Sequence, residues 1–162
     1  MNKFTIGAIG LVVVLLGYLG LTSDQGSDTM GLANAKPSAS KIIVLEQPYD
    51  FGDIEIFDGK VSTDYTLKNE GAEAVVIKKA VTSCGCTEGE IAGFTFGMHS
   101  SEVKDVIIPA GGEEKVKAIY DPLAHGPNGT GPVTRTLHLE TNSAETPRIE
   151  LRFSANVVKT EG

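Results

Sequence analysis

The sequence has no tryptophan, only two cysteines and few aromatic residues, which make up 6% of its 162 residues. Antibody domains hold their core with a tryptophan packed on a bridge between two widely spaced cysteines, and this chain has neither component. Basic residues are also scarce, because 14 Lys and Arg face 21 Asp and Glu for a net charge of -7. An acidic chain without a basic stripe repels phosphate backbones, so we expect no nucleic-acid partner.

The sequence also lacks the short motifs of common enzyme classes. Its glycine-rich segment, residues 125–131, contains Pro127 and precedes no helical pattern, so it predicts a turn and not a phosphate-binding loop. No serine lies in a nucleophile elbow, and acidic pairs such as Glu113 and Glu114 fall where solvated charge is the ordinary explanation. We therefore predict no enzyme activity and no catalytic residue.

The length of the chain suits one domain with its own core and is too short for two. Its 19 glycines and seven prolines follow no repeat, which is typical of a protein with many turns. No helical periodicity occurs after the first apolar stretch. These features favour a single all-β domain.

An uncharged apolar stretch covers residues 4–21. As a helix these 18 residues would extend about 27 Å, close to the ~30 Å hydrocarbon thickness of a bilayer. No small-residue cleavage site follows at a suitable distance, so residues 1–21 predict an uncleaved signal anchor, with a cleaved signal peptide as the alternative. Lys3 before the stretch and Asp24 after it place the following chain outside the cytoplasm. Residues 22–41 are small and polar, as in a flexible tether.

From residue 42 onward the hydrophobic period becomes two, which predicts strands. The clearest strand covers residues 148–157, in which alternate residues from Ile149 to Val157 are apolar. Its partner is predicted over residues 133–141, with residues 142–147 as the connection. About seven short strands over residues 42–158 predict an immunoglobulin-like antiparallel β-sandwich, which leaves residues 159–162 as a tail. The inward residues predicted for the other regular strands are Val61, Thr63, Tyr65, Leu67, Val116, Ala118 and Tyr120.

Five short segments occur in an order that resembles a known family. They are residues 49–54 (Tyr-Asp-Phe-Gly-Asp-Ile), 67–71 (Leu-Lys-Asn-Glu-Gly), 82–87 (Thr-Ser-Cys-Gly-Cys-Thr), 108–112 (Ile-Pro-Ala-Gly-Gly) and 141–142 (Thr-Asn). Over residues 42–158 the chain resembles the bacterial domain of unknown function 1573. The resemblance implies an immunoglobulin-type sandwich, related to the Hydin and major-sperm-protein group, that is exported and attached to the envelope. It implies no activity, because the family has none assigned. The chain departs from the family pattern in a longer segment after Cys86 and in the glycine-rich residues 125–132.

The chemistry of the sequence is concentrated in Cys84 and Cys86, which are separated by Gly85 and flanked by Ser83 and Thr87. In an extended strand, Cα atoms two residues apart are about 6.5–7 Å apart, at or beyond the upper limit for a disulfide. A bridge therefore needs a bend, which Gly85 could supply. Outside the cytoplasm such a pair tends to be oxidised, and so small a ring gains little loop entropy, which makes it a redox candidate more than a structural staple. The alternatives are an inert disulfide and a pair of small buried hydrophobic residues that close the strand end.

The two thiolates could also bind Cu(I), a soft ion, whereas a closed zinc site needs four ligands. His138 falls on the outward face of its predicted strand, where a solvated side chain is the simplest explanation. We therefore assign no metal and no cofactor, with Cys84 and Cys86 as the candidate ligands for Cu(I). The residues that could complete such a site are Met98, His99, His125 and His138.

The sequence as a whole favours a membrane-anchored, extracytoplasmic domain, in the periplasm or outside the cell. Residues 4–21 would hold it to the membrane, and it would act by contact with an unknown envelope protein or in envelope assembly. The alternative function is thiol redox chemistry or Cu(I) handling by Cys84 and Cys86.

The predicted anchor can be tested on the native protein. The protein should stay in the membrane fraction after alkaline carbonate washing, because an apolar helix of this length remains in the bilayer. Mass spectrometry should find the peptide that contains residues 4–21. A soluble form that begins near residue 24 or 36 would contradict the uncleaved anchor and support the cleaved signal peptide.

Overall fold

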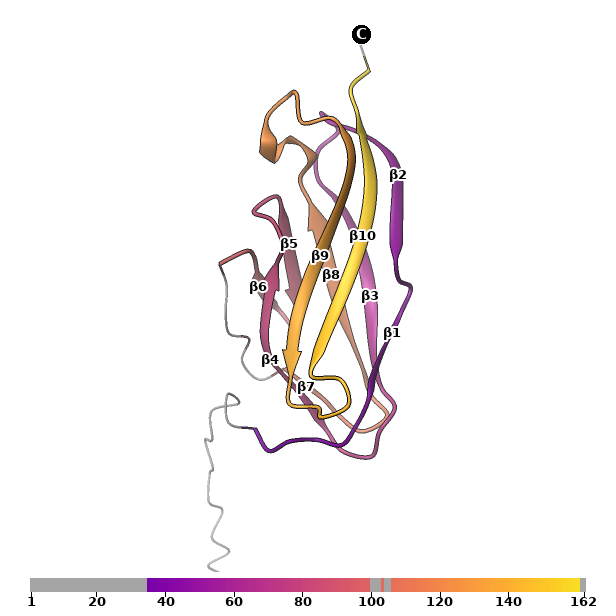
Figure 1. Ribbon diagram of the computed structural model, residues 1–162, viewed down its shortest axis with the longest axis vertical. Coiled ribbons are helices and arrows are strands. Elements are labelled where there is room, and N and C mark those ends of the chain that lie inside the picture. The colour runs from indigo at the N-terminus through magenta and orange to yellow at the C-terminus, as the bar shows by residue number, and fades with distance from the viewer. Residues whose placement is uncertain (1–34, 100–102, 104–105, 161–162) are drawn as a thin grey trace, which may run out of the picture. The chain divides into compact units, whose positions relative to one another are not determined.

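The computed structural model describes residues 35–99, 103 and 106–160, which form a sandwich of two β-sheets (Figure 1). These residues contain ten strands and one 3-10 helix. The elements are β1 (Ile42–Leu45), β2 (Tyr49–Glu55), β3 (Val61–Asn69), β4 (Val75–Thr82), β5 (Thr87–Ile91), β6 (Phe94–Phe96), β7 (Ile107–Ile108), β8 (Glu113–Tyr120), η2 (Pro122–His125), β9 (Gly131–Thr141) and β10 (Arg148–Val158).

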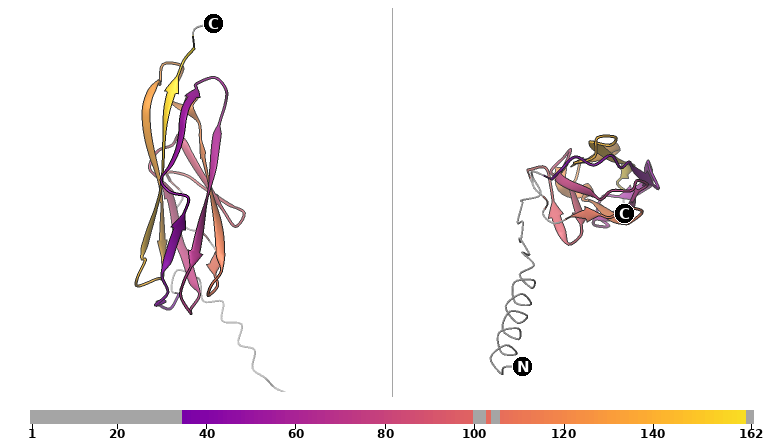
Figure 2. Two further views of the ribbon diagram at one scale, coloured as in Figure 1. Left: turned by 90° about the vertical axis from the view of Figure 1, so that its right-hand side faces the viewer. Right: turned by 90° about the horizontal axis from the view of Figure 1, so that it is seen from below.

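Each sheet contains five strands. Sheet I has the order β1-β3-β8-β5-β6, and sheet II has the order β2-β10-β9-β4-β7. Figure 2 shows the two sheets edge-on as separate layers. The long hairpin of β9 and β10, predicted from the sequence, forms the centre of sheet II. Side chains from the two inner faces fill the space between the layers, as in other β-sandwiches.

The all-β sandwich is confirmed, but two details of the prediction are wrong. The described residues hold ten strands instead of about seven, and β2 pairs in parallel with β10, whereas the other paired strands are antiparallel. β5 and β6 escaped prediction because β5 carries Gly89 at a buried position. The ring of Phe96 on β6 fills that position, and a Cβ atom on Gly89 would collide with the ring. Because glycine has no side chain, the sequence of β5 lacks the alternation of apolar residues that predicts a strand.

The core follows the predicted inward faces of β3, β8, β9 and β10. Phe153, in the middle of β10, is 0% exposed, and its ring centroid lies 5.7 Å from that of Tyr120 and 5.5 Å from that of Phe51. Val61 and Thr63, at the start of β3, are only half-buried. The other predicted inward residues are buried: Tyr65, Leu67, Val116, Ala118, Tyr120, Leu137, Leu139, Ile149, Leu151, Ala155 and Val157.

Residues 38–41, which the sequence assigned to the linker, pack against the sandwich. Ser38 N donates a hydrogen bond to Asn142 O at 2.9 Å, and Ser40 Oγ donates to Glu73 O at 2.7 Å. Both serines are buried. Small polar residues resemble a linker in the sequence, but here they bond to backbone groups of the domain. Ser38 and Ser40, within the residues predicted as a linker, are therefore packed against the folded domain.

The predicted anchor at residues 4–21 and most of the predicted linker lie outside the described residues. Within the described part of the chain, the structure has no helix whose length and apolar character would suit a bilayer crossing. The anchor therefore stays a prediction.

The assignment of the two faces of β10 can be tested by a pair of substitutions. Phe153→Ala should lower the free energy of unfolding by about 3–5 kcal/mol, because it removes a ring packed between two others and leaves a cavity. Arg152→Ala is the matched control. The Arg152 side chain is 56% exposed, and its loss should cost less than about 1 kcal/mol. Urea melts of the full-length variants measure both, and equal losses would contradict the assignment of the two faces.

Candidate functional site

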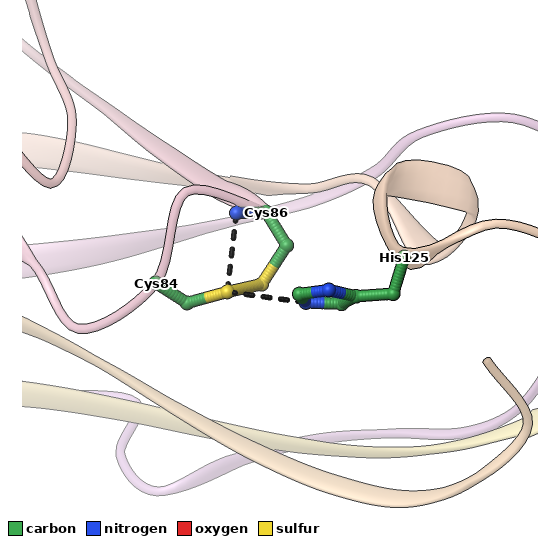
Figure 3. A group of neighbouring side chains, drawn as sticks. All are labelled: Cys84, Cys86 and His125. Atoms are coloured by element: carbon green, nitrogen blue, oxygen red, sulfur yellow. Dashed lines mark hydrogen bonds between the residues drawn. A yellow bond between two sulfur atoms is a disulfide. The ribbon is translucent and has the colours of Figure 1, made fainter.

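The two cysteines lie where the chain crosses from one sheet to the other. β4 ends at Thr82 in sheet II, and β5 begins at Thr87 in sheet I. Residues 83–86 make the crossing, and their change of direction brings the Cα atoms of Cys84 and Cys86 to 5.2 Å. This separation suits a disulfide, and a disulfide joins the two sulfurs (Figure 3).

Hydrogen bonds hold the crossing in its bent shape. The Thr82 hydroxyl lies 2.9 Å from the carbonyl oxygen of Cys84 and 3.0 Å from that of Thr87. Thr82 and Thr87 are both buried, so these contacts are shielded from water. The bend is therefore built into the end of β4 and the start of β5.

Ser83 and Gly85 occupy the exposed side of the crossing. Ser83 N donates to Thr136 O at 2.9 Å, and Ser83 Oγ accepts from Thr136 N at 3.0 Å. A Cβ atom on Gly85 would meet no atom within 4 Å, so the surface beside the disulfide is open there. The hollow next to Gly85 and Cys86 has a volume of about 60 Å³. Pockets that enclose organic ligands measure about 300–1,000 Å³, so this hollow admits an ion or the tip of a side chain.

The two cysteines differ in exposure. Cys84 is half-buried, whereas Cys86 is 3% exposed and belongs to the core. The Cys86 amide donates to Cys84 Sγ at 3.1 Å, and Thr87 Oγ1 lies 3.7 Å from Cys86 Sγ. An external reagent therefore reaches the sulfur of Cys84 more readily than that of Cys86.

Arg135, on β9, places its guanidinium beside the buried sulfur. Its Nε donates to Cys86 Sγ at 3.0 Å, and one terminal nitrogen donates to Thr134 O at 2.8 Å. The guanidinium carbon lies 5.8 Å from the ring centroid of Tyr120, in a cation–π contact. None of the ion pairs between described residues includes Arg135. The disulfide thus has a cation beside it that no carboxylate of the described chain neutralises.

Tyr120 contributes an uncharged surface to this environment. Burial raises the pKa of its phenol above the usual value; the Arg135 guanidinium lowers it and the Asp121 carboxylate raises it by smaller amounts. The phenol is therefore protonated at neutral pH. Tyr120 faces Arg135 as an aromatic ring and supplies no negative charge.

His125 lies beside the disulfide, with its ring next to the sulfur of Cys84 (Figure 3). It is the last residue of η2, and its Nε2 lies 3.4 Å from Cys84 Sγ. Asp121 caps the start of η2 by accepting a hydrogen bond from Leu123 N at 2.9 Å. The Asp121 amide donates to Cys86 O at 2.9 Å, which ties the segment that carries His125 to the cysteine crossing.

The structure brings together only one of the histidines that the sequence offered as ligands. Cys84, Cys86 and His125 each present a ligand atom, and these atoms lie within 4.8 Å of one another. His138 instead pairs with Glu150 at 3.6 Å. His99 is exposed and outside this group, and Met98 is exposed.

Arg135 was missed by the sequence analysis, although a signal for it exists. It lies two residues before Leu137 and four before Leu139, so all three share the inward face of β9. A charged residue in the inward register of a strand needs a partner in the interior or at its edge. The sequence does not show what that partner is, because Cys86 lies far away in the chain, in the crossing between the two sheets.

Two packed five-stranded sheets define this protein as an immunoglobulin-like β-sandwich. Over residues 42–157 the sequence matches the model of a family described as protein of unknown function DUF1573. The chain belongs to this family, which confirms the resemblance inferred from the sequence. No curated protein matches the chain.

Solved structures with a similar fold are distant in sequence. A protein of unknown function from Porphyromonas gingivalis W83 is 14% identical with a TM-score of 0.58, and the match covers 75% of this chain and 49% of that protein. The PapD-like domain 7 of human CEP192 is 15% identical (TM-score 0.46, covering 78% and 92%). WR4, an MSP family member of C. elegans, is 10% identical (TM-score 0.38, covering 75% and 99%). The chain spans about half the length of the Porphyromonas protein. The likeness to the Porphyromonas protein, at 14% identity, shows the fold alone.

Reduction of the disulfide should destabilise the fold only slightly. A ring of three residues restricts the unfolded chain little, so we expect a loss of less than about 2 kcal/mol in urea melts. The oxidised protein should be lighter than the reduced protein by two hydrogens in denaturing mass spectrometry. Unfolding on reduction would show instead that the bridge is a structural staple.

Proposed function

We propose that the disulfide of Cys84 and Cys86 exchanges with the thiols of a partner protein. The observation that supports this function is the unequal environment of the two sulfurs. Cys84 is accessible at an open turn, whereas the Cys86 sulfur is buried and accepts a hydrogen bond from Arg135 Nε at 3.0 Å. Thiol–disulfide exchange needs these two properties, a sulfur open to attack and a leaving sulfur that is stable as a thiolate.

The exchange proceeds in two balanced steps. A partner thiolate attacks Cys84 Sγ, a mixed disulfide forms between the partner and Cys84, and the bond to Cys86 breaks with Cys86 leaving as a thiolate. A second thiolate of the partner then attacks the partner's own sulfur in the mixed disulfide, which closes a disulfide in the partner and releases Cys84 as a thiolate. Two electrons pass from the partner dithiol to the cysteine pair, and the two protons given up by the partner thiols protonate the new thiolates.

Arg135 favours the first step by stabilising the leaving group. A cation next to a cysteine favours the thiolate over the thiol. A hydrogen bond to an ionised acceptor is roughly twice as strong as one to a neutral acceptor. Because no described carboxylate pairs with Arg135, its charge is available to Cys86.

His125 acts next to Cys84, the more accessible cysteine of the pair. Its Nε2, 3.4 Å from Cys84 Sγ, is close enough to accept the proton of an incoming thiol or to return a proton to Cys84 on release. His125 is exposed, so a partner can approach it without a rearrangement of the domain.

The shape of the site favours a protein thiol as the partner. The hollow of about 60 Å³ beside Cys86 is too small to enclose an organic substrate. Leu123, in the same 3-10 turn as His125, is 42% exposed and offers a partner an apolar contact. The contact function expected from the sequence is therefore part of this proposal. The membrane anchor and the extracytoplasmic location stay predictions, and such a location would keep the pair oxidised between encounters.

The exchange is tested on the full-length protein with dithiothreitol, with alkylation and mass spectrometry to follow reduction. The wild type should be reduced faster than it unfolds, because Cys84 is reached in the folded state. Arg135→Gln should slow the reduction several-fold, since the leaving thiolate loses its cation. The matched control is Arg152→Gln, which removes an exposed guanidinium from the neighbouring strand β10 and should leave the rate unchanged.

Two outcomes would contradict the exchange function. One is reduction of the wild type only at its unfolding rate, measured in parallel by hydrogen exchange or urea jumps. The other is an unchanged rate for Arg135→Gln. Urea melts of both arginine variants establish that each is folded under the conditions of the rate measurement.

A further inference from the structure

We infer that the reduced cysteine pair, together with His125, binds one Cu(I) ion. The sulfurs of Cys84 and Cys86 and a ring nitrogen of His125 lie within 4.8 Å of one another (Figure 3). In the part of the chain that the structure describes, no other three Cys, His, Asp or Glu side chains form such a group. The inference rests on the proposed function in one respect, which is that the disulfide can be reduced.

Metal binding follows reduction. A dithiol gives two electrons and two protons, the bond between Cys84 and Cys86 breaks, and two thiols result while the dithiol closes its own disulfide. Cu(I) then displaces both thiol protons and binds the two thiolates and the neutral ring nitrogen of His125. The copper stays Cu(I) throughout, so this step needs no oxidant or reductant. The complex carries one net negative charge, from two thiolates and one monovalent cation.

Contacts independent of the disulfide bond keep the three ligands together. The hydrogen bond from Asp121 N to Cys86 O joins the segment before η2 to the cysteine crossing, and the Thr82 hydroxyl holds the crossing through the carbonyl of Cys84. Neither contact involves a sulfur atom, so neither depends on the bond that reduction breaks. The ligands are therefore gathered before the ion arrives, which lowers the ordering cost of binding.

The donor set favours Cu(I) over Zn²⁺. Thiolates are the soft ligands that Cu(I) prefers, and the imidazole of His125 completes a three-ligand set. A closed zinc site needs four protein ligands, and this group has three among the described residues. Zn²⁺ would have to complete its tetrahedron with water at this exposed turn.

The charge of the site also favours Cu(I) over Zn²⁺. Arg135 Nε lies 3.0 Å from Cys86 Sγ, so a cation is already present beside the ligands. A Cu(I) complex with one net negative charge would be neutralised by Arg135. A Zn²⁺ complex of the same ligands is neutral and would leave Arg135 without a counter-charge.

The ion has an open route to the ligands. Gly85 places no side chain over the sulfurs, and His125 is exposed. The adjoining hollow of about 60 Å³ is lined by Gly85 and Cys86 and lies beside the ligand group. A site of this kind suits a protein that receives Cu(I) from a chelator and passes it on.

The site is tested with the full-length protein, reduced by tris(2-carboxyethyl)phosphine without oxygen and titrated with Cu(I) against bicinchoninate. We expect one Cu(I) per chain. His125→Ala should weaken Cu(I) binding at least about 100-fold, since loss of an outer contact to a metal ligand alone costs about 10–100-fold. The matched control is His138→Ala, which removes a histidine paired with Glu150 and should leave the affinity unchanged.

X-ray absorption gives a second readout that does not depend on affinity. The copper of the wild-type complex should show two sulfur neighbours and one nitrogen neighbour, and the nitrogen should disappear in His125→Ala. Equal Cu(I) affinity for His125→Ala and wild type, absence of a nitrogen neighbour in the wild type, or displacement of Cu(I) by equimolar Zn²⁺ would overturn the inference. His125 is exposed, so its replacement does not put the fold at risk.

Phosphine reduction separates this inference from the proposed function, because a phosphine reduces a disulfide without thiol exchange. Cu(I) binding without exchange between the protein and dithiols would contradict the proposed function alone. Exchange without Cu(I) binding would contradict the copper site alone.

Discussion

Burial of alternate side chains between sheets I and II is the constraint on which the rest of the structure depends. Each large apolar side chain so buried stabilises the fold by roughly 1.5–3 kcal/mol, and the contact of Phe153 with Tyr120 joins the two sheets at the centre. A slip of one residue would turn these side chains to solvent, so burial determines the register of every long strand. It also determines where the chain leaves one sheet for the other, and the cysteines lie at one such crossing.

The site takes its geometry from this frame. Thr87, the first residue of β5, pairs with Tyr120, the last residue of β8. Asp121 follows directly and bonds to the backbone of Cys86, so the pairing that aligns the two strands also brings η2 and His125 to the sulfurs. Cys86 is drawn into the core by the same pairing, whereas Cys84 stays at the surface of the turn. The different exposure of the two sulfurs is therefore a consequence of strand register.

The sequence predicts those parts of the structure that depend on a pattern of residues within one short segment. The alternation along β10 and the connection to β9 are of this kind, and the order of short motifs identified the family. The site could be predicted only in part, because its members are distant in the chain. From the sequence, His125 was one of four candidate ligands. Only the pairing of β5 with β8 in the structure shows that it lies beside Cys84. The inward position of Arg135 on its strand can be inferred from the sequence, but its partner Cys86 lies in the distant crossing between the sheets.

The position of Arg135 bears on the direction of electron transfer. An inward-facing guanidinium loses hydration, and the contact with the Tyr120 ring offsets this by only about 0.5–2 kcal/mol. The neutral disulfide supplies no counter-charge, whereas a thiolate at Cys86 would place a full negative charge 3.0 Å from Arg135 Nε. Their attraction is stronger there than in water, because the effective dielectric constant at a buried sulfur is lower. Arg135 thus stabilises the reduced pair relative to the oxidised pair, and a pair whose reduced form is stabilised is the stronger oxidant. In the proposed exchange, the electrostatics of the crossing would therefore favour the transfer of electrons from partner thiols to Cys84 and Cys86.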